Sequence, residues 1–170
     1  MKRFGTAVVE LPSDREIVIT RMFDAAAELV FEVWTTPAYV RRWWSIDAAP
    51  LIVCDIDLRV GGRWRYVSRD GDGVELGWTG VYHEIVTGKR IVSNEVFEGY
   101  PDAEAVDTLT LTEQGGITTL AVHVLHRTKQ NRDGHVLSGM EAGMQLAMNR
   151  LELLLNPPDA ESDTTKENRT

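Results

Sequence analysis

Cysteine is almost missing from this sequence, and basic residues are fewer than acidic ones. Cys54 is the only cysteine among 170 residues, which excludes an intrachain disulfide and a zinc site made from several cysteines. It lies in the apolar run 51–54, a setting typical of a small buried hydrophobe. With 18 Lys and Arg against 26 Asp and Glu, the formal net charge is −8. Binding of nucleic acid, which requires clustered positive charge, is therefore not expected.

Long apolar runs are also missing. No stretch approaches the roughly 20 residues of a transmembrane helix, and no apolar segment follows Lys2 and Arg3 as in a signal peptide. We therefore expect a cytoplasmic protein with no membrane span. The composition, 43% apolar and 26% charged, is typical of one globular domain. We expect a flexible N-terminal arm at 1–14, one domain at 15–156 and a disordered tail at 157–170.

Most of the chain alternates between β-branched or apolar runs and turn residues. A first strand is expected at 17–23, followed by two short helices, one with apolar residues at helical spacing from Ala27 to Trp34 and one beginning at Pro37. This pair predicts an αα-hairpin after the first strand. Six further strands are predicted at 50–58, 63–68, 74–85, 90–97, 105–111 and 118–126. Their short connections favour an antiparallel sheet of about seven strands.

The last periodic segment predicts one long helix, from Asp133 to Leu155, that ends before Pro157. At 1.5 Å per residue it would span about 33 Å, enough to cross a whole sheet face. Gly139 and Gly143 each imply close packing against the sheet or space left for a ligand, because glycine weakens a helix. The expected fold class is therefore α+β, a curved antiparallel sheet around a long C-terminal helix.

Several short motifs carry a resemblance to a known family. They lie at 21–25, 30–34, 42–44, 57–64, 80–85 and 139–143. In the order and spacing of these motifs, the chain resembles the helix-grip fold of the START-like (SRPBCC) superfamily, in particular the branch named after the C-terminal domain of the activator of Hsp90 ATPase. Ala26 and Val60 occupy positions where that family often has proline.

The resemblance implies several functions. Similar proteins include ligand carriers and cyclases of aromatic polyketides. The leading prediction is binding of a small hydrophobic or aromatic molecule in a cavity between the C-terminal helix and the sheet. A cyclase- or hydrolase-type enzyme using the same cavity is one alternative, and a protein-interaction module regulating a chaperone ATPase is another. Hsp90 itself is not an expected partner, since that role belongs to larger proteins with an additional N-terminal domain. A homodimer through an exposed strand edge remains open.

Aromatic side chains and methionines are the main candidates for the cavity lining. Residues two apart on a strand share a face, and tryptophan and methionine supply the adaptable apolar lining common in ligand pockets. The predicted ligand-binding residues are Trp43, Trp44, Trp64, Tyr66, Trp78, Tyr82, Glu95, Phe97, Met140 and Met144.

Glu95 is the one charged candidate. It alternates with Ser93 and Phe97 in an apolar strand, and the pattern leaves open whether it faces the cavity or solvent. An inward carboxyl group would carry a raised pKa and could act as a general acid or orient a ligand. His123 and His126 are three apart on a strand and face opposite sides, so no metal site is expected, nor any cofactor. No convincing catalytic constellation is present.

Overall fold

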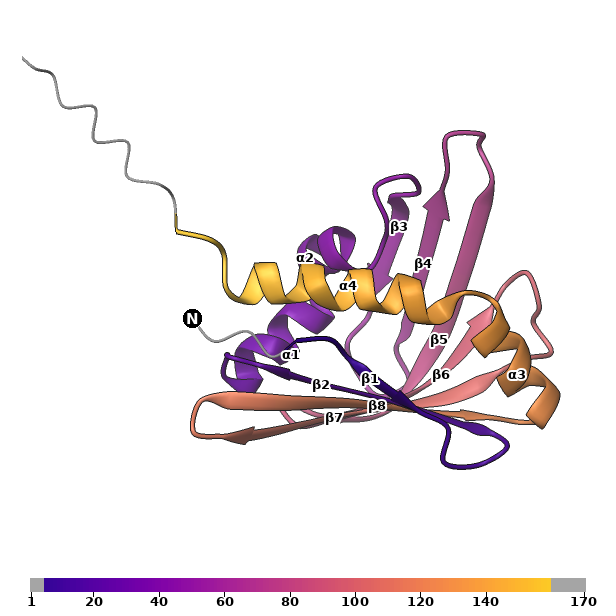
Figure 1. The fold of residues 1–170 in the computed structure, drawn as a ribbon. Helices are drawn as coiled ribbons and strands as arrows, with labels where there is room; N and C mark the ends of the chain where they lie inside the picture. The colour runs from indigo at the N-terminus through magenta and orange to yellow at the C-terminus, as the bar shows by residue number, and fades with distance from the viewer. Residues whose placement is uncertain (1–4, 160–170) are drawn as a thin grey trace, which may run out of the picture.

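A curved antiparallel sheet and four helices make up the fold (Figure 1). The structure, a computed structural model, describes residues 5–159. In this range the strands are β1 (Val8–Glu10), β2 (Glu16–Phe23), β3 (Leu51–Ile56), β4 (Arg63–Arg69), β5 (Glu75–Val86), β6 (Arg90–Phe97), β7 (Ala105–Gln114) and β8 (Ile117–His126). The helices are α1 (Ala27–Thr35), α2 (Pro37–Trp43), α3 (Lys129–Leu137) and α4 (Met140–Leu155).

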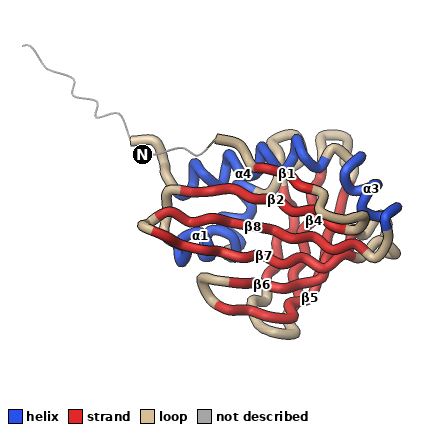
Figure 2. Tube along the Cα trace, turned by 60° about the horizontal axis from the view of Figure 1, so that its bottom comes forward, coloured by secondary structure: helices blue, strands red, loops and turns tan. Residues whose placement is uncertain are grey.

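The eight strands of the described residues form one sheet in the order β1-β2-β8-β7-β6-β5-β4-β3, with every neighbouring pair antiparallel. The strands β3 to β5 run in a clearly different direction from β2, β7 and β8, so the sheet curves (Figures 1 and 2). Helices α1, α2 and α4 lie on the concave side (Figure 1). The α+β helix-grip prediction is therefore confirmed.

The helical hairpin carries the chain from β2 near one edge of the sheet to β3 at the other. Thr36 ends α1 and precedes α2, whose first residue is Pro37, a position where proline is favoured because its missing N–H needs no partner. The first helix has no side-chain cap of its own. Instead, Glu113 on β7 accepts a hydrogen bond from the backbone N–H of Ala27 at 2.8 Å, which ties the hairpin to the sheet.

Two details of the elements differ from what the sequence predicted. The sheet has one strand more than predicted, because Val8–Glu10, within the segment expected as a flexible arm, pairs with β2. The single long helix is broken: α3 ends at Leu137 and α4 begins at Met140, because Gly139 takes the left-handed conformation (φ 82°). Helix α4 alone has 16 residues, so it spans about 24 Å rather than 33 Å.

Gly139 and Gly143 have structural roles that differ from those expected from the sequence. A Cβ atom added at Gly139 or Gly143 would meet no atom within 4 Å, so neither marks a close approach of the helix to the sheet. Gly139 is explained by its positive φ, and nothing in the structure requires glycine at Gly143.

A buried ion pair fastens α4 to the sheet. Arg21 on β2, 2% exposed, donates a hydrogen bond of 3.0 Å to Glu152 and another of 2.7 Å to Asn149.

No helix within residues 5–159 is long and apolar enough to cross a membrane. Most of the predicted tail at 157–170, and the first residues of the predicted arm, lie outside the described residues.

Candidate functional site

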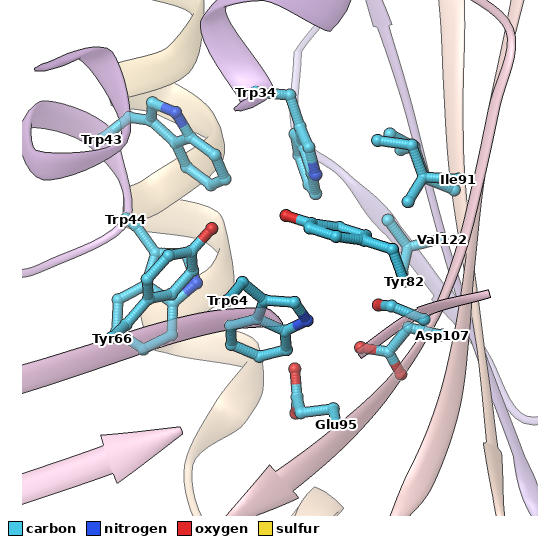
Figure 3. Close-up of a pocket in the computed structure, with 12 residues that line it drawn as sticks. Trp34, Trp43, Trp44, Trp64, Tyr66, Tyr82, Ile91, Glu95, Asp107 and Val122 are labelled. Atoms are coloured by element: carbon cyan, nitrogen blue, oxygen red, sulfur yellow. The ribbon is translucent and has the colours of Figure 1, made fainter. Parts of the chain in front are cut away.

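A cavity lies between the helical hairpin and the inner face of the sheet (Figure 3). Its volume is about 90 Å³. Since one water molecule takes up about 30 Å³ in the liquid, the cavity has room for a group of only a few heavy atoms. Its lining is Trp34, Trp43, Trp44, Trp64, Tyr66, Tyr82, Ile91, Ser93, Glu95, Asp107, Leu109 and Val122.

Three of the lining tryptophans come from the helical hairpin. Trp43 is buried and donates a hydrogen bond of 2.9 Å from its indole N–H to the carbonyl oxygen of Val33, which fixes the ring against α1. Its ring centroid lies 4.6 Å from that of Trp34. Trp44, half-buried, approaches Tyr66 edge-on at 5.2 Å. These contacts hold the hairpin as an aromatic roof over the sheet.

The facing aromatic residues come from β4 and β5. Trp64 and Tyr66 are two apart and share the inner face, with ring centroids 4.9 Å apart, as the strand period predicts. Trp64 can lie over β5 because its cross-strand partner is Gly80, where a Cβ atom would come within 2.4 Å of the indole nitrogen. Burial raises the pKa of Tyr66 and of Tyr82, so both phenols stay protonated and can donate hydrogen bonds.

We call these six rings the aromatic cage: Trp34, Trp43, Trp44, Trp64, Tyr66 and Tyr82. They surround the open centre of the cavity, and the carboxyl groups of Glu95 and Asp107 lie together at its sheet side (Figure 3).

Glu95 on β6 and Asp107 on β7 form an acidic pair. Glu95 faces the cavity, so the orientation that the sequence left open is the inward one. Burial first, then the charge of Glu95 and a hydrogen bond with it, raises the pKa of Asp107 well above its usual value. One oxygen of Asp107, Oδ1, is shielded from solvent and has no hydrogen-bond partner. The pair therefore offers a protonated carboxyl group and an unused acceptor to whatever enters the cavity.

Two histidines join β8 to α3 near the acidic pair. The Nε2 atom of His126 lies 3.1 Å from Nδ1 of His135. Burial, with smaller effects from His135 and Arg132, lowers the pKa of His126 to about 4. Burial also lowers the pKa of His135, against the opposing charge of Glu95. At neutral pH both rings are uncharged, and one donates a hydrogen bond to the other.

The predicted site residues divide into those that line the cavity and those that do not. Trp78 and Phe97 do not line the cavity but pack next to it. The ring centroid of Trp78 lies 4.7 Å from that of Trp44 and 5.6 Å from that of Phe97. Met140 and Met144 are partly buried against the core but do not line the cavity, and no other residue of α4 does. The cavity therefore lies under the helical hairpin and not, as expected, under the C-terminal helix. The predicted residues that do line it are Trp43, Trp44, Trp64, Tyr66, Tyr82 and Glu95.

The remaining lining residues were not predicted as site residues. Two of them had a usable signal in the sequence. Trp34 belongs to the apolar stripe of α1, and Asp107 alternates with the apolar residues Ala105 and Leu109 just as Glu95 does on its own strand. The others were Ile91, Ser93, Leu109 and Val122, which the sequence does not distinguish from ordinary core residues.

A second hollow, of about 340 Å³, lies beside the ion pair of α4. It is lined by Gly5, Arg21, Asn149, Glu152 and Leu153. Its polar wall is already occupied by the Arg21 hydrogen bonds, and no aromatic ring contributes to it. Within residues 5–159, no group of three or more His, Cys, Asp or Glu side chains could hold a metal ion.

An open antiparallel sheet that grips a C-terminal helix and encloses an aromatic cavity defines a helix-grip protein of the START-like type. The chain belongs to the family described as activator of Hsp90 ATPase homolog 1-like protein, whose model matches residues 24–156.

Several solved structures share this fold. A protein from Rhodobacter sphaeroides is 26% identical, with a TM-score of 0.84 over 89% of this chain and 98% of that one. Protein Ms6760 from Mycobacterium smegmatis is 21% identical, with a TM-score of 0.81 over 92% and 100% of the two chains. A protein from Arthrobacter aurescens is 20% identical, with a TM-score of 0.80 over 95% and 98%. No curated protein matches the sequence.

Proposed function

We propose that the protein binds a small hydrophobic or aromatic molecule in the cavity between the helical hairpin and the sheet. The observation that carries this proposal is the aromatic cage, in which six rings from four separate elements converge on one space. Apolar cavities with a few placed polar groups are typical of small-molecule sites. Here the acidic pair supplies the polar groups.

The size of the cavity limits what enters it without rearrangement. About 90 Å³ is less than the 150 Å³ of an engineered cavity that binds benzene. A ring therefore enters only if a wall moves. Trp34 and Trp44 are the half-buried members of the cage, and both belong to the helical hairpin. An outward shift of this hairpin would enlarge the cavity while the sheet stays in place.

The proposal is tested by filling the cavity. Val122 on β8 lines it, whereas Val106 on β7 is 39% exposed on the outer face. Isothermal titration calorimetry with phenol, indole and toluene should show saturable binding of at least one probe at one site per chain. Val122→Phe should abolish that binding, and Val106→Phe should preserve it. Equal binding by the two variants, or no binding by the wild type, would contradict the proposal.

A second candidate function is catalysis of the cyclase or hydrolase kind in the same cavity. The observation that favours it is the acidic pair, because burial and the neighbouring Glu95 raise the pKa of Asp107, so that its carboxyl group can act as a general acid. Tyr82 also lines the cavity and adds a hydrogen-bond donor to it.

Chromogenic aryl esters test this second candidate. The wild type should hydrolyse them with saturation kinetics, and Asp107→Asn should lower the rate at least about 100-fold, the usual minimum effect of a general acid or base. A rate of ester hydrolysis that is unchanged by Asp107→Asn would contradict catalysis by the acidic pair. It would not contradict the proposal that the cavity binds a ligand.

A further inference from the structure

The cage combines two features that recognise a particular class of ligand. Its walls are six electron-rich aromatic rings, and its only ionisable lining groups besides the two phenols are two carboxyl groups. No Lys, Arg or His contributes to the lining. A site with aromatic faces, carboxyl groups and no positive charge favours a cation over a neutral molecule or an anion.

We infer that the aromatic cage binds a small organic cation, an alkylated ammonium group, with the acidic pair as its counter-charge. This inference rests on the proposed ligand-binding function and names the class of ligand. The charged head group would sit among the rings, and the rest of the ligand would extend toward the opening of the cavity.

The size of the cavity agrees with a head group rather than with a whole ligand. A volume of about 90 Å³ holds a nitrogen atom with a few attached carbons. Tryptophan is the strongest aromatic partner for a cation, and four of the six rings are tryptophans. Enclosure among rings also removes water, which strengthens the attraction between the cation and each ring face.

The acidic pair has no cationic side chain of the described residues as its partner, so it is available to pair with a bound cation. The Oδ1 atom of Asp107 is buried and accepts no hydrogen bond among the described residues. Other buried or partly buried acids form ion pairs, as Glu152 does with Arg21 and Glu104 with Arg127. No salt bridge within the described part of the chain uses Glu95 or Asp107.

Because Asp107 is protonated in the empty site, binding of a cation should depend on pH. In the empty site Asp107 keeps its proton, because burial and the neighbouring Glu95 raise its pKa. A bound cation stabilises the ionised pair, so binding releases this proton. The affinity for the cation should therefore increase with pH until Asp107 ionises in the free protein, and the affinity for a neutral ligand should not. The other titratable groups that interact with Glu95, His135 on α3 and Tyr66 on β4, are uncharged at neutral pH, because the pKa of His135 is lowered and that of Tyr66 is raised.

Choline and 3,3-dimethylbutan-1-ol form a matched pair of probes, because they have nearly the same shape and differ in charge. Titration calorimetry at pH 7.5 should show that choline binds at least tenfold more tightly than the alcohol. Glu95→Gln and Asp107→Asn should each remove most of this preference. Asp72→Asn, which neutralises an exposed acid in the β4–β5 hairpin, should leave it unchanged.

The possible results separate the inference from the function on which it rests. Equal affinity for the two probes, or a preference that survives Glu95→Gln and Asp107→Asn, would overturn the inference. Binding of phenol, indole or toluene without binding of choline would overturn it while leaving the proposed function standing. Failure of every probe, charged and neutral, would overturn both.

Discussion

Arg21 and Glu152 form an ion pair of 3.0 Å that is shielded from solvent and joins β2 to α4. It is not fully satisfied: Nε of Arg21 and Oε1 of Glu152 lack hydrogen-bond partners among the described residues. The loss of water around both charges is therefore only partly offset, and the pair is expected to specify where α4 docks more than to stabilise the fold.

Removing one member of this pair should be worse than removing both. Arg21→Met leaves a buried carboxylate without its partner and should lower the free energy of unfolding by about 3–5 kcal/mol. Adding Glu152→Leu removes that isolated charge, so the double variant should recover much of the loss. Urea denaturation of the four proteins of this cycle measures the effect. A double variant less stable than Arg21→Met would contradict the interpretation.

The pair of histidines predicts a loss of stability in acid. The pKa of His126 is lowered to about 4 in the folded protein, below the value of about 6.5 expected in the unfolded chain. The unfolded state therefore binds more protons between these pH values, and the free energy of unfolding falls as pH drops from about 6.5 to 4. Fully lost, this contribution is on the order of 3 kcal/mol, at 1.4 kcal/mol per pH unit.

Asp107 acts in the opposite direction over part of the same range. Its pKa is raised on folding, so its effect on stability becomes more favourable as pH falls. The test is therefore a comparison: His126→Leu should show a smaller acid-induced loss than the wild type when denaturation is followed at pH 7, 6, 5 and 4. Parallel curves for the two proteins would show that His126 does not carry the effect.

Two glycines predict opposite outcomes for the same substitution. At Gly80 an added Cβ atom would lie 2.0 Å from the backbone oxygen of Asn94 and 2.4 Å from the indole nitrogen of Trp64. Gly80→Ala should therefore destabilise the protein by about 1–3 kcal/mol, as overpacking of a core does, and displace Trp64 from the cage.

Gly143→Ala is the control, because its Cβ atom would meet nothing within 4 Å inside α4. It should stabilise the protein by about 0.5–1 kcal/mol through higher helix propensity. Thermal and urea denaturation of both variants provide the measurement. Equal and small effects at the two positions would contradict the packing described around Trp64.

Much of the fold was predictable because the strands carry strong local signals. The run 90–97 alternates and is bounded by turns, and β6 has those limits. Strand β1 was missed because three residues are too few to show a period, and its pairing with β2 is a tertiary contact. The break at Gly139 was missed because the apolar stripe continues across it; only the backbone conformation shows that the helix ends.

The site was less predictable than the fold for a physical reason. Period-two alternation correctly places Trp64 and Tyr66 on one face, since that depends only on the strand. Whether Met140 reaches the cavity depends on how α4 docks, which the sequence does not encode locally. Asp107 carried the same alternation as Glu95, so applying one rule to both strands would have paired them.

The central claim is that the aromatic cage receives a ligand, and 4-iodophenol tests it most directly, because iodine is located by its anomalous scattering. Crystals grown with this probe should show the ring between Trp43, Trp64 and Tyr82, with its hydroxyl group toward the acidic pair. In crystals of Val122→Phe this density should be missing. A cage that stays closed and empty while the iodine occupies other sites would contradict the account.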